Sequence, residues 1–376
     1  MCIFDFFKKV VKRKRNNEMG ITAKITGIKY VPKLINNLDV FDFDNLNINE
    51  LPANCLVKYG GFSFGLSKWV SPKRTRSYPY ERVYNTLGTS KRITVIPIIK
   101  DEGIEGDRDF IQWDTVSLMS LLDVFVIFGY YNTAEKHKTG KNKITNQQFD
   151  NELVRQKITE IKNYHSSALH WNLNEIRQSF PELIKKSKLF YNSIGEQLGI
   201  QFHDEQGIDK FAEQFNYGVK DFMETSRQKA KEAQNREMQT IQPKEALSTL
   251  TKAAITIENY LGGKYYFTTD EIKIDKDKLF LIEAKHSKNS ILPSIGDIKD
   301  GLLKMILYTN LKDVSINGNK YTSIPVLKLT SSILKKGISQ SEIDTNKELN
   351  ENQKNMLKKL FDEAGTNNFE VVIEKA

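Results

Sequence analysis

Hydrophobic residues switch between helical and extended spacing along residues 244–329, and this alternation constrains the fold most strongly. Apolar residues three and four positions apart follow Pro243 and predict a helix that ends at Gly262-Gly263. Two apolar runs, at 265–275 and 279–285, then flank a short polar turn. This pattern predicts two antiparallel strands joined as a hairpin.

A second helix and a further strand complete this segment. Ser294 and Asp297 match the residues that cap a helix at its amino terminus, and the helical spacing continues to Thr309. Residues 323–329 form another apolar run of strand length. The predicted order is helix, two strands, helix, strand. It indicates a mixed α/β (α+β) class, with helices flanking a central sheet.

The rest of the chain divides by its periodicity. Apolar runs at 94–99 and 124–131 are typical of strands, whereas helical spacing begins near residue 146. We expect four regions: a strand-rich amino-terminal region at 1–145, a helical region at 146–240, the core described above at 241–330, and a carboxy-terminal helix and strand at 331–376.

Composition and charge order exclude a membrane or secreted protein. The longest apolar stretch, at 121–131, is broken by Asp123 and is too short to cross a bilayer. Residues 1–15 place their cations after their apolar residues, which is the reverse of a secretory signal. We therefore expect a cytoplasmic protein.

The metal-binding residue types are also limited. Cys2 and Cys55 are too few for a disulfide framework, a zinc knuckle or a cysteine-ligated iron–sulfur cluster. The chain has five histidines, and His165 and His170 are spaced so that they do not share a helical face. Oxygen ligands are therefore the expected ligands of any metal.

Asp270, Glu283 and Lys285 form the arrangement that carries chemistry. Residues i and i+2 of a strand share a face, so Glu283 and Lys285 project together and the Ala284 carbonyl remains available as a ligand. Asp270, on the preceding strand, can approach Glu283 across the ladder. Phosphodiester hydrolysis needs a divalent cation, which prefers carboxylate oxygens, and a lysine can orient the nucleophile or stabilise developing charge.

Glu-x-Lys alone is a weak signal in this chain. It also occurs at 160–162 and 271–273, and Asp-x-Lys occurs at 297–299. Only the copy at 283–285 follows an apolar run within its own predicted strand and has an acid on the preceding predicted strand. It also lies between two predicted helices. An exposed hairpin with alternating charges is the alternative interpretation.

Asp270, Glu283 and Lys285 resemble the signature of PD-(D/E)XK nucleases, and the order helix, strands, helix, strand is similar to the core of that fold. The resemblance covers roughly residues 244–330. It implies a restriction-endonuclease-like core with a large amino-terminal extension. It also implies that Asp270 and Glu283 ligate Mg²⁺ and that Lys285 assists the attacking water. Thr269 stands where the signature often has proline.

Four further residues are candidates by position. Lys304 and Tyr308 lie four apart on a helix similar to one in several type II restriction endonucleases, so both are expected to reach the DNA backbone or the scissile phosphate. Glu258 could join the metal site, as an acid at this position does in some relatives of the fold. Asp275 could replace Asp270 if the strand register differs. A surface lysine, a half-buried tyrosine and a solvated Glu258 are the plainer interpretations.

A basic segment, residues 71–92, contains six cations and one acid with interleaved tyrosines. Guanidinium groups bind phosphate oxygens or guanine edges in bidentate fashion, and tyrosines contact sugar or base. The net charge of +9 permits binding to a polyanion. A solvated basic loop is the alternative. The candidates for DNA contact are Lys73, Arg74, Arg76, Tyr78, Arg82 and Arg92.

Together these features predict a type II restriction endonuclease that hydrolyses double-stranded DNA at specific sites with Mg²⁺. Residues 1–240 would supply recognition and assembly. A homodimer would match a palindromic site, and a cognate DNA methyltransferase is expected as a genetic neighbour. Two alternatives remain: a structure-specific repair or recombination nuclease, and a non-catalytic DNA-binding protein with a decayed nuclease site.

Overall fold

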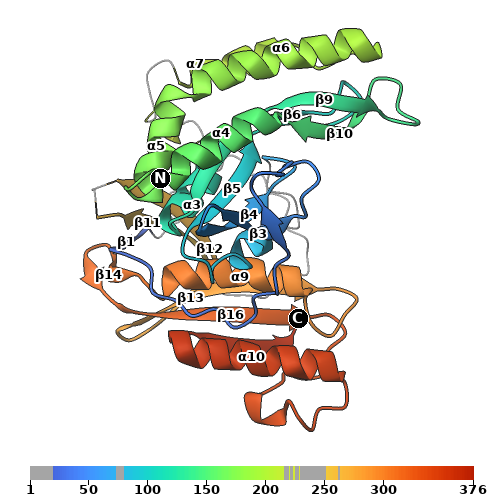
Figure 1. Ribbon diagram of the computed structural model, residues 1–376. Coiled ribbons are helices and arrows are strands. Elements are labelled where there is room, and N and C mark those ends of the chain that lie inside the picture. The colour runs from blue at the N-terminus through green and yellow to red at the C-terminus, as the bar shows by residue number, and fades with distance from the viewer. Residues whose placement is uncertain are drawn as a thin grey trace, which may run out of the picture.

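A mixed sheet of eight strands and a smaller sheet of five strands organise the protein, and helices pack around both (Figure 1). The computed structural model describes residues 20–72, 80–215, 220, 223–224, 228, 251–260 and 263–376. The mixed α/β class predicted from the sequence is confirmed. Within these described ranges, no helix has both the length and the apolar character that crossing a bilayer requires.

The large sheet combines antiparallel and parallel neighbours. In spatial order its strands are β15 (Asn319–Lys320), β14 (Lys312–Ile316), β1 (Gly20–Lys24), β11 (Thr251–Glu258), β12 (Lys264–Asp275), β13 (Lys278–Ser287), β16 (Thr322–Ser331) and β17 (Glu370–Lys375). Strands β11, β12 and β13 form an antiparallel meander, whereas β13, β16 and β17 run parallel. The predicted hairpin, β12 and β13, and the predicted strand β16 are therefore confirmed.

Two helices connect the parallel strands and lie on the same face of this sheet (Figure 1). α9 (Ile295–Tyr308) joins β13 to β16, and α10 (Glu351–Asn367) joins β16 to β17 after the short 3-10 helix η1 (Gln340–Glu342). Parallel neighbours require such crossover connections. The Ser294 side chain accepts the Asp297 N–H at the start of α9, as predicted.

The helix predicted between Pro243 and Gly262 is wrong in its described part, where residues 251–258 form β11. β11 lies between β1 and β12, and Ala253, Ile255 and Ile257 alternate toward the buried interior. This segment is short and apolar, so its spacing fits a helix as well as an internal strand. Its β-branched residues favour the strand once neighbours are present on both sides.

The large sheet extends beyond the core predicted at 241–330. β1 comes from the amino-terminal region and pairs with both β11 and β14. β17, from the predicted carboxy-terminal helix and strand, pairs with β16. The amino-terminal region and the predicted core therefore share one sheet.

The smaller sheet is built from the strand-rich region that the sequence predicts. Its strands in spatial order are β2 (Val40–Asp42), β3 (Asn54–Tyr59), β4 (Phe62–Lys68), β5 (Arg92–Pro97) and β8 (Phe125–Gly129). The apolar runs predicted as strands at 94–99 and 124–131 correspond to β5 and β8. Two hairpin-like pairs extend from this sheet: β6 (Ile99–Asp101) with β7 (Arg108–Phe110), and β9 (Tyr131–Lys136) with β10 (Ile144–Phe149).

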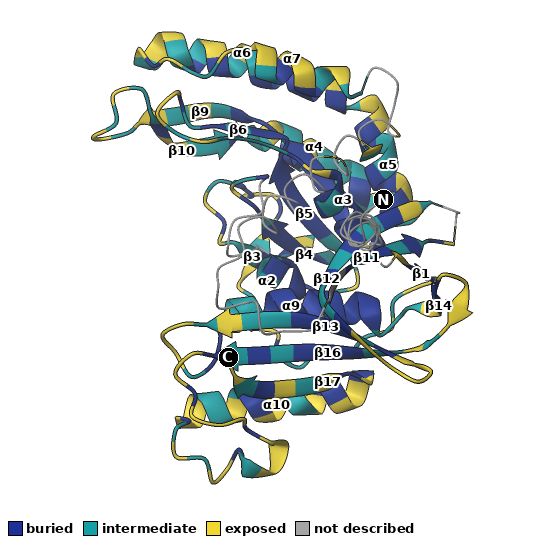
Figure 2. Ribbon diagram, turned by 180° about the vertical axis from the view of Figure 1, so that it is seen from behind, coloured by how far each residue is buried: buried dark blue, intermediate teal, exposed yellow. Residues whose placement is uncertain are grey.

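Helices fill the space around the two sheets. They are α2 (Tyr80–Tyr84), α3 (Trp113–Leu121), α4 (Asn151–Lys162), α5 (Ala168–Gln178), α6 (Phe180–Leu198) and α7 (Gln206–Glu213). The predicted change to helical structure near residue 146 occurs at Asn151, where the Asp150 side chain caps α4. α2 packs against α9, which is buried from Ile298 to Tyr308 (Figure 2).

The carboxylate of Glu363 in α10 joins the amino-terminal region to the large sheet. It is fully buried and accepts the hydroxyl groups of Tyr30 at 2.7 Å and Tyr84 at 2.7 Å, together with the Lys33 N–H at 2.8 Å. The Leu34 N–H also donates to this carboxylate, at 3.2 Å. A buried carboxylate needs such donors because it has lost its hydration.

We expect Glu363→Ala to lower the free energy of unfolding by about 3 kcal/mol, because it leaves several buried donors without an acceptor. Urea denaturation measures the change. Glu351→Ala, at a site on the same helix where the side chain is 81% exposed, is the control and should change stability by less than about 0.5 kcal/mol. Equal effects of the two substitutions would contradict a joining role for Glu363.

Candidate active site

The β12–β13 ladder ends where the predicted site begins. Its paired register ends with Glu271 opposite Ile282. One residue further, the Asp270 side chain replaces main-chain pairing, because its Oδ2 accepts the Ala284 N–H at 2.9 Å. Asp270 therefore faces the strand that carries Glu283, as the sequence predicted.

A bulge in β12 accompanies this change. Thr251 of β11 lies opposite Ile272 and Ala253 lies opposite Thr269, so two steps along β11 match three steps along β12. The Thr269 hydroxyl donates to a β13 carbonyl at 2.8 Å, which ties the bulge to the neighbouring strand. A bulge changes the direction in which the side chains beside it point. Asp270 lies within the bulged stretch of β12.

Glu283 and Lys285 project from the same face of β13, as their spacing predicts. Lys285 Nζ lies 3.0 Å from Glu283 Oε1. Glu283 is 6% exposed, and its register partner on β16 is the fully buried Leu327. The charged pair is therefore held against an apolar strand that excludes water from one side.

The surroundings of this cluster disfavour the charged form of Asp270 and favour the lysine cation. Burial and the nearby Glu283 carboxylate raise the pKa of Asp270 to about 6. Burial alone would lower the pKa of Lys285, but the charge and hydrogen bond of Glu283, together with the charges of Asp270 and Asp300, outweigh burial and raise that pKa. Two carboxylates crowded in this way are stabilised by a cation between them.

The ligands available to a metal are two carboxylates and one carbonyl. Within the described residues, no three His, Cys, Asp or Glu side chains lie close enough together to hold an ion. The N–H and C=O of one strand residue point to the same neighbouring strand, so the Ala284 carbonyl points toward the Asp270 side of β13. Asp270, Glu283 and this carbonyl suit Mg²⁺, which keeps several waters in its coordination shell.

Lys304 and Tyr308 share one face of α9, as predicted, but this face packs against β12. Lys304 Nζ and the Tyr308 hydroxyl both donate to the Thr268 carbonyl, at 3.3 Å and 3.4 Å. Both residues are buried because α9 lies between the large sheet and α2. The direct DNA contact predicted for them conflicts with this burial, although Lys304 is close enough to lower the pKa of Asp270.

Asp300 is a buried acid beside the site that the sequence analysis missed. Its Oδ1 accepts the Glu81 N–H of α2 at 2.5 Å. Burial raises the pKa of Asp300 to about 8, and the charge of Lys285 opposes this rise. Asp300 lies four residues before Lys304, so the two residues share one helix face. This spacing was the sequence signal that could have identified Asp300.

The two alternative acids lie away from Asp270. Glu258 ends β11 opposite Lys264, whereas Asp270 lies near the other end of β11. Asp275 lies beside the hairpin turn, opposite Lys278. Five residues of extended chain span roughly 16 Å, so neither acid reaches the Asp270 carboxylate.

The basic segment is described only from residue 80 onward, together with residues 71 and 72. Lys73, Arg74, Arg76 and Tyr78 lie outside the described residues. Arg82 Nη1 donates to the Lys68 carbonyl at 2.6 Å, in a half-buried position. The predicted DNA contacts of this segment therefore stay predictions.

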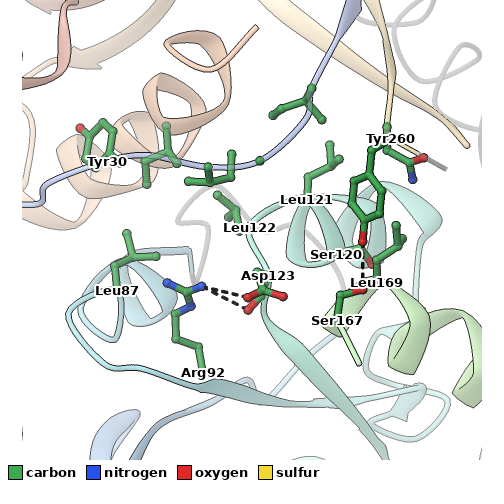
Figure 3. Close-up of a pocket in the computed structure, with 15 residues that line it drawn as sticks. Tyr30, Leu87, Arg92, Ser120, Leu121, Leu122, Asp123, Ser167, Leu169 and Tyr260 are labelled. Atoms are coloured by element: carbon green, nitrogen blue, oxygen red, sulfur yellow. Dashed lines mark hydrogen bonds and ion pairs between the residues drawn. The ribbon is translucent and has the colours of Figure 1, made fainter. Parts of the chain in front are cut away.

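Arg92 lies in a cavity of about 360 Å³ between the two sheets (Figure 3). Its Nη2 is 3.5 Å from Asp123 Oδ2, and the side chain is 19% exposed. Leu87, Leu121 and Leu122 surround the pair. Burial lowers the pKa of Arg92, and Asp123 partly offsets this effect. Because the guanidinium already has a protein partner, contact with DNA would require it to leave Asp123.

Comparison of the chain with protein-family models, curated proteins and solved structures finds no match. Function must therefore be inferred from the side chains and their arrangement. The arrangement combines two carboxylates, a lysine and a correctly directed carbonyl at one end of a strand pair.

Tight packing between α9 and Lys285 leads to a stability prediction. A Cβ at Gly301 would lie 2.7 Å from Leu327 Cδ1 and 3.2 Å from Lys285 Cε. We expect Gly301→Ala to lower the free energy of unfolding by about 1 to 2 kcal/mol through overpacking. Gly365→Ala in α10, where a Cβ would meet no atom within 4 Å, should instead stabilise by about 0.5 to 1 kcal/mol. Denaturant titration distinguishes the two, and stabilisation by both would show that β13 and α9 are not closely packed.

Proposed function

We propose that this protein is a Mg²⁺-dependent endonuclease of the type II restriction class, which hydrolyses phosphodiester bonds in double-stranded DNA. The single observation that carries the proposal is the hydrogen bond from the Ala284 N–H to Asp270, beside the Glu283–Lys285 pair. It joins residues from two strands into one cluster with the composition that phosphodiester hydrolysis needs.

The roles follow from the positions of the side chains. Asp270, Glu283 and the Ala284 carbonyl would hold Mg²⁺, which when bound lowers the pKa of a coordinated water and offsets phosphate charge. Lys285 provides a cation beside these ligands that can orient the attacking water and stabilise charge developing on the phosphate. Lys304, tied to the Thr268 carbonyl, adds a second positive charge near Asp270.

The arrangement of strands supports the nuclease class. The meander β11–β12–β13, the crossover helix α9 and the parallel strand β16 surround the cluster. This order is similar to the core implied by the PD-(D/E)XK resemblance, with one more strand than the sequence predicted. The finer assignment to a restriction-endonuclease-like core is part of the proposal.

DNA recognition is assigned to the amino-terminal region. The cations at 73–76 precede α2 in the chain, and they are a residue type suited to phosphate contact. α2 itself packs against α9. We propose action in the cytoplasm as a homodimer on a palindromic site, with a cognate DNA methyltransferase encoded nearby.

Digestion of unmethylated phage DNA and supercoiled plasmid tests the proposal. We expect discrete fragments with Mg²⁺ and none with EDTA. Lys285→Ala and Asp270→Asn should each lower the cleavage rate by at least about a hundredfold, because each removes a group that acts on the reacting atoms. Lys278→Ala, at an exposed position on the same hairpin, is the matched control and should cleave at the unaltered rate.

The other outcomes separate the alternatives. Undiminished cleavage by Lys285→Ala would contradict its assigned role. Cuts confined to junctions or damaged sites would favour a structure-specific repair or recombination nuclease. Salt-sensitive DNA binding without Mg²⁺-dependent turnover would favour a non-catalytic DNA-binding protein.

A further inference from the structure

The cavity between the two sheets combines an apolar lining with one ion pair (Figure 3). Its volume of about 360 Å³ falls within the range of about 300 to 1,000 Å³ that small-molecule sites occupy. Asp123 and Tyr260 are exposed, so the cavity opens to solvent beside them. The buried apolar side chains that line it are Ile25, Leu121, Leu122, Leu169 and Ile306.

Arg92 is the cation of this cavity, and its guanidinium group is only partly satisfied. The group offers five N–H donors. Its Nη2 lies 3.5 Å from Asp123 Oδ2 and 3.4 Å from the Asp123 carbonyl oxygen, and both distances exceed the roughly 2.7 to 2.9 Å of a charge-assisted hydrogen bond. Its Nε is buried without a hydrogen-bond partner among the described residues. A guanidinium in apolar surroundings is therefore stabilised by any further acceptor that reaches it.

Asp123 has a second partner besides Arg92. Its Oδ1 accepts the Ala168 N–H at 3.2 Å, in the first turn of α5. The amino-terminal end of a helix carries a partial positive charge, so α5 offsets part of the charge of this carboxylate. The polar end of the cavity therefore favours an anion, and Arg92 can bind one while α5 keeps Asp123 in place.

The lining also defines the chemical class of the ligand. Apolar side chains favour an aliphatic body, because each CH₂ group that leaves water contributes to binding. A guanidinium group matches a carboxylate in bidentate fashion. Asp123 lies beside Arg92 and repels added negative charge, so a monoanion suits the site better than a phosphate dianion.

We propose that this cavity binds a small aliphatic monocarboxylate, with its carboxylate on Arg92 and its chain against Leu121 and Leu122. The site is distinct from the carboxylate–lysine cluster, because Arg92 belongs to β5 of the smaller sheet and Asp270 to β12 of the large sheet. The proposal does not depend on the nuclease function. Its ligand reaches Arg92 without the departure of Asp123 that contact with DNA would require.

Isothermal titration calorimetry of the full-length protein with octanoate tests the proposal, and 1-octanol is the uncharged control. Arg92→Met removes the charge and should raise the Kd for octanoate at least tenfold, while the Kd for octanol changes by less than twofold. Arg155→Met is the matched control. Arg155 is also half-buried, but its Nη1 donates to the Phe43 carbonyl at 2.6 Å, outside the cavity. This variant should change neither Kd by more than twofold.

Asp123→Asn tests the direction of the electrostatic effect. Asparagine tolerates the left-handed backbone of this position, where φ is 57°, and its side-chain oxygen can still accept the Ala168 N–H. Loss of the negative charge beside Arg92 should lower the Kd for octanoate at least threefold and leave the Kd for octanol unchanged. Opposite shifts from the two substitutions indicate a carboxylate bound at the guanidinium group.

Two further measurements test the apolar contacts and their location. From butanoate to hexanoate, the Kd should fall about fourfold for each added CH₂ group. Octanoate should shift the methyl NMR signals of Leu121, Leu122 and Leu169. The methyl signals of Leu189, which is 59% exposed on α6, should not move.

The proposal is overturned if wild type does not bind octanoate, or if Arg92→Met weakens octanoate and octanol equally. A Kd that is independent of chain length, or methyl shifts confined to residues outside the cavity, would also overturn it. If Arg92→Met does not fold, Arg92→Lys takes its place. This variant keeps the charge but loses the planar fork, and it should raise the Kd for octanoate at least threefold. Absence of DNA cleavage would contradict the nuclease function and leave these binding measurements decisive.

Discussion

The burial of charged side chains in α9 is the constraint on which the rest of the structure depends. A helix between a sheet and another helix would normally be apolar on both sides, yet Lys299, Asp300 and Lys304 are all buried in α9. Because a buried charge is costly without a partner, each fixes a neighbour. Lys299 holds the side chain of Asn85, Asp300 holds the α2 backbone, and Lys304 holds a β12 carbonyl.

These contacts join the amino-terminal region to the strands that carry the candidate site. The amino-terminal region shares a strand, β1, with the large sheet, and Glu363 ties the same region to α10. The candidate site lies where the pairing of β12 with β13 ends, next to the bulge in β12. Asp270 and the Glu283–Lys285 pair come from two neighbouring strands of the large sheet, and α9 packs against the strand that carries the pair.

Much of the site could be predicted from local sequence. Glu283 and Lys285 share a face because strands have a period of two, and the turn between β12 and β13 fixed their hairpin. The pairing of Asp270 with this strand followed from the same register. By contrast, the DNA contact expected for Lys304 and Tyr308 conflicts with their burial, and the helix expected near Ile257 was wrong. Both depend on what packs around them, which short periodic patterns do not reveal.

The sequence by itself determined the mixed class, the hairpin, the capped helix α9 and the residues of the carboxylate–lysine cluster. These features depend on contacts between neighbours in the chain, which periodicity and turn chemistry encode. Only the tertiary structure decided that β1 and β17 join the same sheet and that Asp300 is buried against α2. Such placements depend on how distant segments are buried against one another. Local sequence periodicity does not encode that packing.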